Sequence, residues 1–489
     1  MLMTFTWIAL TVYLTCTMFM VVFSLVQLDL TRRFLQGRMK QGTLTLAGAH
    51  PMVTIQLPMY NERFVAGRLM EAVDRIDWPA DRLEIQVLDD STDDTTAVVM
   101  EHVRRMNAAG REVKLIRRAT RAGFKAGALS EGLTKARGEF IAIFDADFLP
   151  SPDFLTRTIP LFTNDRIGTI QARWGHLNSD VNLLTRLQAL GLDAHFTIEQ
   201  QARSSTSCFL NFNGTCGVWR KSCIIDAGGW RDVSLTEDLD LSYRAQLKGW
   251  TISYLKDLVV PGELPERMDA LKAQQYRWTK GGAETARLLM SEVLRSKLPA
   301  GKKIHAVMHL GASALFPAIF LAGLVSLVLQ WSGDRLTTID WLLRLGSIGF
   351  LGFLSVSLFY VVSISRNPAN RLWHLPLFLT VSMGLSFHNT VAVIEGWLGR
   401  RTPFIRTPKL SSGNGQRQAV MENSYRSVVG AGFMVELLLG GSFAVAVACE
   451  LTSGTIGFLL FHGMLAIGFC TVGGYSLMEG LSGKRWKDQ

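Results

Sequence analysis

The chain has 489 residues, of which 48% are hydrophobic, and its formal net charge is +10. Many basic residues flank apolar stretches and do not form the dense stripe of a nucleic-acid-binding protein, so nucleic acid is excluded as a partner. The six cysteines lack a CxxC pair, which favours free thiols over a metal–thiolate site or a disulfide framework; they are Cys16, Cys208, Cys216, Cys223, Cys449 and Cys470.

The first apolar stretch, residues 4–28, carries no charge and is long enough to cross a hydrocarbon core of about 30 Å as a helix. No small-residue cleavage site follows it. The basic residues that follow instead are Arg32, Arg33, Arg38 and Lys40. This pattern predicts a retained membrane anchor rather than a signal peptide, and we assign residues 1–44 to the anchor and a basic linker.

Residues 45–300 alternate short apolar strands with helical patterns. The predicted strands are 53–57, 83–88, 113–116 and 140–144, and the predicted helices are 63–76, 95–108 and 125–135. This alternation predicts a Rossmann-like α/β domain with a largely parallel sheet and helices on both faces. Ligands of such domains bind beyond the carboxyl ends of the strands.

Carboxylates follow two of these predicted strands. Asp145 and Asp147 are one residue apart, and oxygen ligands held in this way suit Mg²⁺ or Mn²⁺ shared with a nucleotide diphosphate. Asp89 and Asp90 are placed to accept hydrogen bonds from a nucleotide base and ribose. The same loop also has the residues to cap the helix that follows, and the two interpretations are compatible.

Two further motifs lie at predicted strand-to-helix junctions. Tyr60 and Glu62 follow the first strand, where Tyr60 offers a flat face to a base, or the pair simply starts a helix. Lys125 lies among small residues at a helix start, which suits a phosphate or a base edge as well as an ordinary surface turn.

The sequence Thr236-Glu237-Asp238 precedes another helical pattern. As a general base, Asp238 would deprotonate an acceptor hydroxyl while that hydroxyl attacks the anomeric carbon of a sugar, and this single displacement inverts the configuration. Alternatively, Thr236 is the N-cap of a capping box. In the later run Gln274–Trp278, Arg277 offers a fork of donors to a diphosphate and Trp278 a flat face to a sugar, although both residues also suit a membrane-interface helix.

Residues 301–489 are apolar again, with stretches at 305–331, 343–364, 372–398, 427–449 and 454–477. Because nucleotide sugars are made in the cytosol and basic loops stay inside, we expect a cytoplasmic catalytic domain, an external N-terminus and five transmembrane helices. The polar residues of segment 372–398 predict that it lies along the interface or re-enters; they are His374, His388, Asn389 and Glu395. The basic loop 399–426 is then cytoplasmic.

Taken in order, the motifs PMYNE, LDDS, FKAG, DAD, TED and QQYRW resemble the family 2 membrane glycosyltransferases of the cellulose synthase superfamily, over about residues 45–285. The run from Asn211 to Arg220 and the motifs GGW and ELP are most similar to the mannan/glucan-synthase-like branch. The resemblance implies a GT-A catalytic domain inserted between transmembrane helices, a nucleotide-sugar donor and a divalent metal.

The resemblance also implies roles for individual residues. Donor-binding residues would be Tyr60, Glu62, Asp89, Asp90, Lys125, Asp145, Gln274 and Arg277, and the metal would be held by Asp145 and Asp147. Catalytic residues would be Asp238, Glu237 and Thr236, and acceptor-binding residues would be Trp278, Asn213, Gly214 and Thr215. A gating-like loop would contain Phe404, Thr407 and Lys409, with Arg406 in place of the valine that is usual in bacterial cellulose synthase.

Two acceptors remain open from the sequence. A processive enzyme would extend and translocate a β-linked polysaccharide, taking the hexose from a UDP-glucose or GDP-mannose type of donor. A non-processive enzyme would instead glycosylate a membrane lipid such as diacylglycerol, ceramide or a polyprenyl phosphate. Under both hypotheses we expect the transmembrane helices to contact membrane lipids.

Overall fold

The computed structural model describes residues 2–37, 49–331, 348–367, 371–402, 432–454 and 457–485. The three residues of the expected gating-like loop, Phe404, Thr407 and Lys409, lie outside these ranges, as does most of segment 399–426. All six cysteines lie within them as free thiols, as the sequence predicts.

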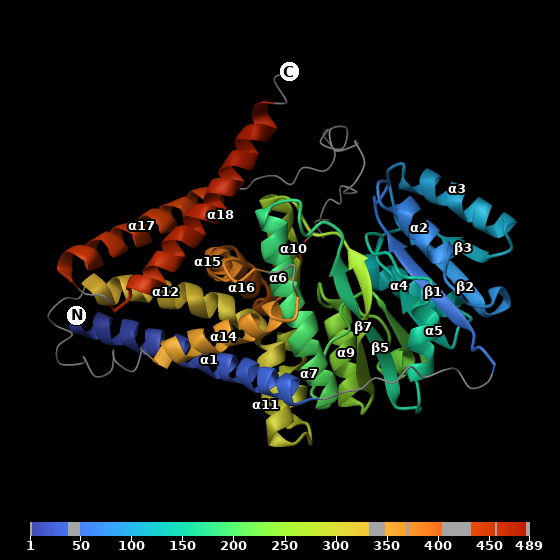
Figure 1. Ribbon diagram of the computed structural model, residues 1–489, viewed down its shortest axis with the longest axis horizontal. Coiled ribbons are helices and arrows are strands. Elements are labelled where there is room, and N and C mark those ends of the chain that lie inside the picture. Colours follow the sequence, from blue (N-terminus) through green and yellow to red (C-terminus); the bar gives the residue numbers. More distant parts are fainter. Residues whose placement is uncertain are drawn as a thin grey trace.

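A seven-stranded mixed sheet forms the centre of the α/β domain (Figure 1). Its strand order is β3-β2-β1-β4-β6-β5-β7, and β6 runs antiparallel to both of its neighbours. The strands are β1 (Val53–Met59), β2 (Leu83–Asp89), β3 (Glu112–Ile116), β4 (Phe140–Ile143), β5 (Ile167–His176), β6 (Gly217–Arg220) and β7 (Thr251–Gly262). The first four match the predicted strands closely, whereas β5, β6 and β7 were not predicted.

Helices cover both faces of this sheet, so its central strands are buried on both sides, and the polar side chains of β1 and β2 pair with each other, as Gln56 Nε2 does with Gln86 Oε1 at 3.0 Å. One face packs against α2 (Ala66–Asp74) and α3 (Thr95–Ala108) through side chains such as Leu69 and Val99. The other packs against α4 (Phe124–Lys135), α8 (Lys221–Asp226) and α9 (Glu237–Leu247). The predicted α/β layering is therefore confirmed.

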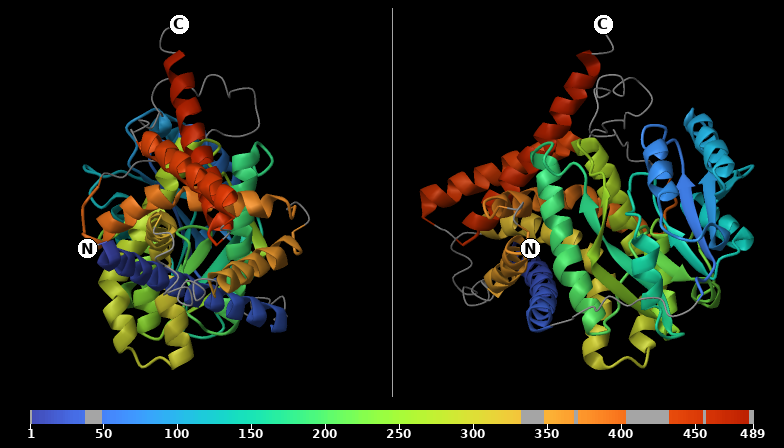
Figure 2. Two further views of the ribbon diagram at one scale, coloured as in Figure 1. Left: turned by 90° about the vertical axis from the view of Figure 1, so that its left-hand side faces the viewer. Right: turned by 45° about the vertical axis from the view of Figure 1, so that its right-hand side comes forward.

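A set of helices joins the sheet to the apolar part of the molecule. It consists of α6 (Leu183–Ala194), a π-helical turn (His195–Glu199), α7 (Gln200–Ser205), α10 (Met268–Arg295) and α11 (Ala300–Leu310). In Figure 1, α6, α7 and α10 lie between the sheet and the apolar helices, whereas α11 projects below them; the right-hand view of Figure 2 also shows α6 between the two parts. Side chains on these helices can therefore reach the carboxyl ends of the strands while the helices also contact the apolar part of the molecule.

Within the described residues, four helices are long and apolar enough to cross a membrane. They are α1 (Leu2–Gln36), α12 (Leu315–Trp331), α17 (Gly432–Ser453) and α18 (Leu459–Arg485). The candidate spans are Thr4–Gln36 in α1, Ala312–Trp331 in α12 and the turn before it, the whole of α17, and Leu459–Leu481 in α18. They gather at one end of the molecule together with the shorter apolar helix α14 (Ile348–Ile364) (Figure 1). The expected span 305–331 starts later than predicted, at Ala312, because residues 305–310 belong to α11.

Segment 372–398 forms two helices, α15 (His374–Gly384) and α16 (Ser386–Trp397), whose axes bend by 47° at the break between them. A bend of this size suits either a re-entrant segment or a broken span, and counting the pair as one span raises the number of candidate spans to five. Two of the four polar residues that set this segment apart in the sequence have partners on α10. His388 Nε2 lies 3.0 Å from the Lys272 carbonyl oxygen, and the Tyr276 hydroxyl donates to the Glu395 carboxylate.

Candidate active site

A cavity of about 240 Å³ opens at the carboxyl ends of β1, β2 and β4. Fourteen of the residues singled out in the sequence line it: Tyr60, Glu62, Asp90, Lys125, Asp145, Asp147, Asn213, Gly214, Thr236, Glu237, Asp238, Gln274, Arg277 and Trp278. They come from seven motifs spread over more than 200 residues of sequence, so the fold brings residues that are distant in the chain to one cavity.

Lys125, near the start of α4, connects three walls of the cavity. Its Nζ lies 2.6 Å from Asp145 Oδ1 and 3.7 Å from Glu237 Oε1, and it donates to the Gly214 carbonyl oxygen at 2.9 Å. Burial alone would lower the pKa of Lys125, but Asp145 and Glu237 outweigh burial and raise it above its ordinary value. The ammonium group therefore stays charged and holds the acidic residues together.

Asp145 and Asp147 lie just beyond β4, and both face the cavity. Within the described residues, no cluster of three or more His, Cys, Asp or Glu side chains is placed to hold a metal ion by itself. Mg²⁺ and Mn²⁺ sites that serve phosphate chemistry commonly use one or two carboxylates, with waters and substrate phosphates completing the shell. The pair therefore fits a cation shared with a diphosphate rather than a closed structural metal site.

Asp238 lies at the start of α9, beside Glu237 and the loop that contains Gly214. Gly214 has a φ of +77°, and a Cβ atom there would lie 3.1 Å from Asp238 Oδ2. Burial first, and then the neighbouring Glu237 carboxylate, raise the pKa of Asp238 to about 7. A carboxylate with a pKa near neutrality is suited to accept a proton during a reaction. The alternative role of Thr236 as a helix cap is not seen, because its side chain makes no capping hydrogen bond.

Helix α10 packs directly against this catalytic segment. The Leu235 amide donates to Glu284 Oε2 at 2.8 Å, and the Thr236 and Thr285 hydroxyl oxygens lie 3.3 Å apart. Gly281 allows the close approach, since a Cβ atom there would lie 2.6 Å from Thr236 Cγ2. Helix α10 also carries Gln274, Arg277 and Trp278. It therefore sets the position of these three side chains relative to the segment that contains Asp238.

The opposite side of α10 is fixed by the C-terminal helices. Lys272 Nζ lies 2.6 Å from Glu436 Oε2 of α17, whose side chain is almost completely buried. The Glu479 carboxylate of α18 accepts hydrogen bonds from the backbone amides of Met268, at 2.8 Å, and Asp269, at 3.1 Å. These amides belong to the first turn of α10 and have no partner within that helix, so α18 supplies the cap.

The side of the cavity formed by Tyr60 and Asp90, where we expected a nucleotide base, differs from the expectation in one respect. One face of the Tyr60 ring is covered by the Arg121 guanidinium, whose carbon lies 3.3 Å from the ring centroid. Asp90 is held by Arg118, with Arg118 Nε 3.0 Å from Asp90 Oδ1. A base that stacks on Tyr60 therefore has one face of the ring available, or must displace Arg121.

Asp89 and Thr215 were expected at the site but lie outside the cavity. Asp89 is turned into its own loop, where its carboxylate accepts from the Ser91 amide at 2.9 Å and from the Thr96 hydroxyl at 2.6 Å. Thr215 is buried behind Asp145 and accepts the Asp145 amide hydrogen at 2.9 Å. Both side chains shape the loops that present their neighbours, and neither is placed to contact a ligand in the cavity.

Several lining residues were not predicted from the sequence. Arg121 lines the cavity beside Tyr60, and Arg118 lies behind the lining, where it holds Asp90. Trp174 and His176 lie at the end of β5, and the Trp174 ring centroid is 6.5 Å from that of Trp278. No local signal identified β5, because its edges are defined by pairing with β6 and β7, which are distant in sequence.

Arg277 is a buried cation in the wall of the cavity. Burial lowers the pKa of Arg277 to about 10, against the opposing effect of Asp145, Glu62 and Asp147. The guanidinium remains protonated at neutral pH and faces a mostly acidic wall. A ligand with a diphosphate would bring negative charge to a cavity in which carboxylates partly balance the positive charge of Lys125 and Arg277.

Comparison with known proteins matches this part of the chain to a described family. Residues 50–281 match the model "Glycosyltransferase like family 2". Glucomannan 4-beta-mannosyltransferase 2 of Arabidopsis thaliana is 40% identical over 371 residues, which cover 74% of this chain and 68% of that protein. Glucomannan 4-beta-mannosyltransferase 1 of Oryza sativa subsp. japonica is 48% identical over 268 residues, which cover 53% of this chain and 51%, about half, of that protein.

A solved structure supports the fold. The mannosyltransferase PcManGT from Pyrobaculum calidifontis, in complex with GDP-Man and Mn²⁺, superposes with a TM-score of 0.57 at 19% identity. The match covers 80% of this chain and 100% of that one. The GT-A architecture expected from the sequence is therefore confirmed.

Proposed function

Since this chain belongs to the family 2 glycosyltransferases, in their cellulose-synthase-like branch, we propose that it transfers mannose from GDP-mannose to a growing β-linked polysaccharide. The choice of mannose rests on the names of the relatives, and the β-linkage also follows from a single inverting displacement. The observation that carries the proposal is the gathering of Asp145, Asp147, Asp238, Arg277 and Trp278 around one cavity.

Each residue then has a chemical task. Asp238 accepts the proton of the acceptor hydroxyl as its oxygen attacks the anomeric carbon and the bond to the diphosphate breaks. Lys125 and Arg277 offer positive charge to the diphosphate, and Trp278 supports the apolar face of the acceptor sugar beside Trp174. The near-neutral pKa of Asp238 lets it hold the proton until the product leaves.

A divalent cation completes the proposed site. Asp145 and Asp147 would hold Mg²⁺ or Mn²⁺, which would neutralise charge on the departing diphosphate. Mn²⁺ is the ion named with the structural neighbour. We expect chelation with EDTA to abolish transfer and either ion to restore it.

The membrane arrangement is also part of the proposal. We place residues 45–300 on the cytoplasmic side, with residues 1–44 and 301–489 anchoring the domain through five spans and with processive extension coupled to translocation. The basic residues in the last turns of α1, Arg32 and Arg33, and the apolar character of α12, α14, α17 and α18 support this placement.

The test is product analysis with purified protein. Incubation with labelled GDP-mannose, GDP-glucose, UDP-glucose and UDP-N-acetylglucosamine, each with Mg²⁺ or Mn²⁺, is expected to give a long product from GDP-mannose that an endo-β-mannanase degrades. A chloroform-soluble product that carries a single sugar would overturn the polysaccharide proposal in favour of a lipid acceptor. Turnover of UDP-sugars alone would overturn the choice of donor.

A further inference from the structure

A second cavity, of about 170 Å³, lies beside the end of β5. Gly175 and His176 line both this cavity and the catalytic one, so the end of β5 belongs to the walls of both. Other lining residues come from β5, from α6 and from the connection between α14 and α15; they include Arg173, Arg186, Asp193, Asn367 and His374. The proposed donor and acceptor sites do not account for this second cavity.

The charged groups of the second cavity are unequally paired. Asp193 is almost completely buried and has partners within the protein: Arg173 Nη2 lies 3.2 Å from Asp193 Oδ1, and Asn367 Nδ2 donates to Oδ2 at 2.6 Å. Among the described residues, the carboxylate nearest to Arg186 is that of Asp180, at 4.0 Å, and this side chain is 86% exposed. Since an exposed and loosely held carboxylate neutralises little charge, Arg186 gives the cavity a net positive charge.

Two polar atoms in residues of this wall have no hydrogen-bond partner in the part of the chain that the structure describes, Arg173 Nε and His374 Nε2. Buried polar groups are nearly always paired, so two such atoms beside one cavity are unusual. Both atoms are covered in this arrangement. Arg186, whose side chain is 46% exposed, is therefore the cation that a ligand can reach directly.

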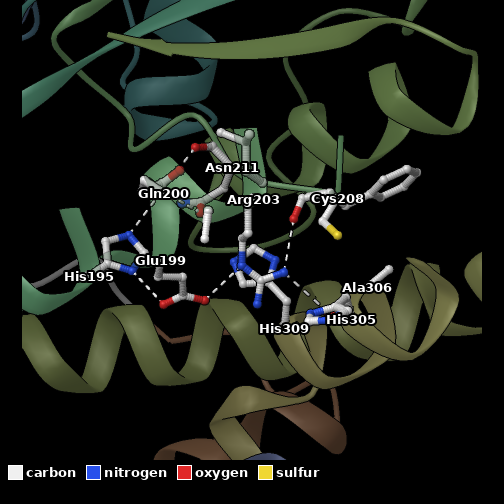
Figure 3. Close-up of polar contacts among 12 residues, drawn as sticks. His195, Glu199, Gln200, Arg203, Cys208, Asn211, His305, Ala306 and His309 are labelled. Carbon is white, nitrogen blue, oxygen red and sulfur yellow. Dashed lines mark hydrogen bonds and ion pairs between the residues drawn. The ribbon is translucent and has the colours of Figure 1, made fainter. Parts of the chain in front are cut away.

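Buried charge in the neighbouring π-helical turn and α7 is matched within the protein. Arg203 Nε donates to Glu199 Oε1 at 2.9 Å, and Arg203 Nη1 donates to the His305 carbonyl oxygen at 3.4 Å (Figure 3). These donors are directed at protein acceptors, as expected of an arginine with a structural role. Arg186 differs, because its contact with a protein acceptor is a long one, to the Asp180 carbonyl oxygen at 3.5 Å.

The second cavity lies where the apolar surface of α14 ends. Side chains such as Leu358 are exposed along α14, and Asn367 lies three residues beyond the end of that helix. The same connection carries the exposed side chains of Arg366, Arg371 and Trp373. Exposed arginine and tryptophan beside the end of an apolar helix are typical of the lipid headgroup level. Helix α6 packs against both α14 and α15, so the cavity adjoins this level.

We propose that the second cavity binds the phosphate-bearing headgroup of an anionic phospholipid, with the Arg186 guanidinium donating to the phosphate oxygens. A guanidinium presents a fork of donors that suits phosphate, and basic pockets between apolar helices on the cytoplasmic side hold such headgroups. The acyl chains would lie along the exposed apolar side of α14. The inference rests on the proposed membrane arrangement and is independent of which sugar is transferred. A bound headgroup would also hold the end of β5, which carries Trp174, against α6.

The test measures lipid binding by the full-length protein in a neutral detergent, where no bilayer surface potential concentrates anions. Dioctanoyl phosphatidylglycerol and dioctanoyl phosphatidylcholine are titrated in parallel, and bound lipid is followed by native mass spectrometry. We expect saturable binding of phosphatidylglycerol and much weaker binding of phosphatidylcholine, which has no net charge. Arg186→Gln should raise the dissociation constant for phosphatidylglycerol by at least about tenfold, because it removes a hydrogen bond between charged groups.

Arg32→Gln is the matched control. Arg32 is also an exposed arginine near the end of an apolar helix, with 58% of its side chain exposed, but it does not line the cavity. This variant removes the same charge and should bind phosphatidylglycerol as the wild type does. An equal loss of binding in both variants would indicate unspecific attraction to basic residues and would overturn the proposal, as would unchanged binding by Arg186→Gln.

Competition experiments distinguish the lipid from other ligands. Inorganic phosphate that displaces phosphatidylglycerol at an equal concentration would assign the cavity to a free anion, and displacement by mannohexaose would assign it to the acceptor; either result overturns the lipid proposal. No sugar is transferred in this assay, so failure of the proposed function would leave its result unaffected. Arg186 is exposed on α6 and glutamine has a similar helix propensity, so we expect the Arg186→Gln protein to fold.

Discussion

Replacing Gly281 with alanine tests whether α10 positions the catalytic segment. The added methyl carbon would lie 2.6 Å from Thr236 Cγ2 and 2.8 Å from the Thr236 backbone nitrogen, so α10 or the segment must shift. Overpacking of this kind costs about 1–3 kcal/mol, against a gain of about 1 kcal/mol from helix propensity. Because a shift of about 1 Å in reacting groups can lower a rate about 100-fold, we expect kcat to fall by that order.

The neighbouring glycine gives the control. A Cβ atom at Gly282 would lie 2.5 Å from Ser313 Oγ, a single atom that one side-chain rotation moves away. Gly282→Ala gains the same helix propensity, so Gly281→Ala should be less stable by about 1–3 kcal/mol in denaturant unfolding and far slower in transfer. If the two variants transfer sugar at similar rates, the contact between α10 and Thr236 does not position the site.

Three further predictions concern the chemistry. Asp238→Asn should lower kcat about 10²- to 10⁴-fold while calorimetry shows unchanged GDP-mannose binding, and lost binding would point to a metal role instead. Asp238 must be deprotonated to act as a base, and its pKa is raised to about 7, so kcat/KM should rise with pH through that value. Glu237→Gln removes the neighbouring like charge and should move this rise to lower pH. An unchanged pH profile in that variant would contradict the assignment of Asp238 as the base. Trp278→Ala should reduce transfer to acceptor more than donor hydrolysis, whereas equal losses would argue against stacking on the acceptor.

Much of the catalytic domain follows from local sequence patterns. The helix predicted at residues 95–108 is α3, and the first four strands end where polar residues begin, because periodicity and turn residues are local properties. The carboxyl ends of parallel strands meet at one edge of a sheet, so the convergence of Asp90 and Asp145 was predictable before any coordinates.

What the sequence did not reveal depends on partners far away in the chain. β5 and β7 pair with each other across about 80 residues, and Trp174 enters the cavity only through that pairing. Similarly, Asp89 and Asp90 are adjacent and chemically identical, yet Arg118 draws one toward the cavity while Ser91 and Thr96 retain the other. The motif identifies both aspartates as candidates, and only their tertiary contacts determine which one faces the cavity.

The cap that Glu479 places on α10 has a consequence for the order of biosynthesis. The ribosome makes the strands, Asp238 and Trp278 long before Glu436 and Glu479, which hold the first turns of α10. The wall that carries Arg277 is therefore secured only after the final two helices have been made and have packed against α10. A nascent or truncated polypeptide ending before residue 432 would lack those anchors, so catalytic competence would arrive only when the C-terminal helices have folded against α10.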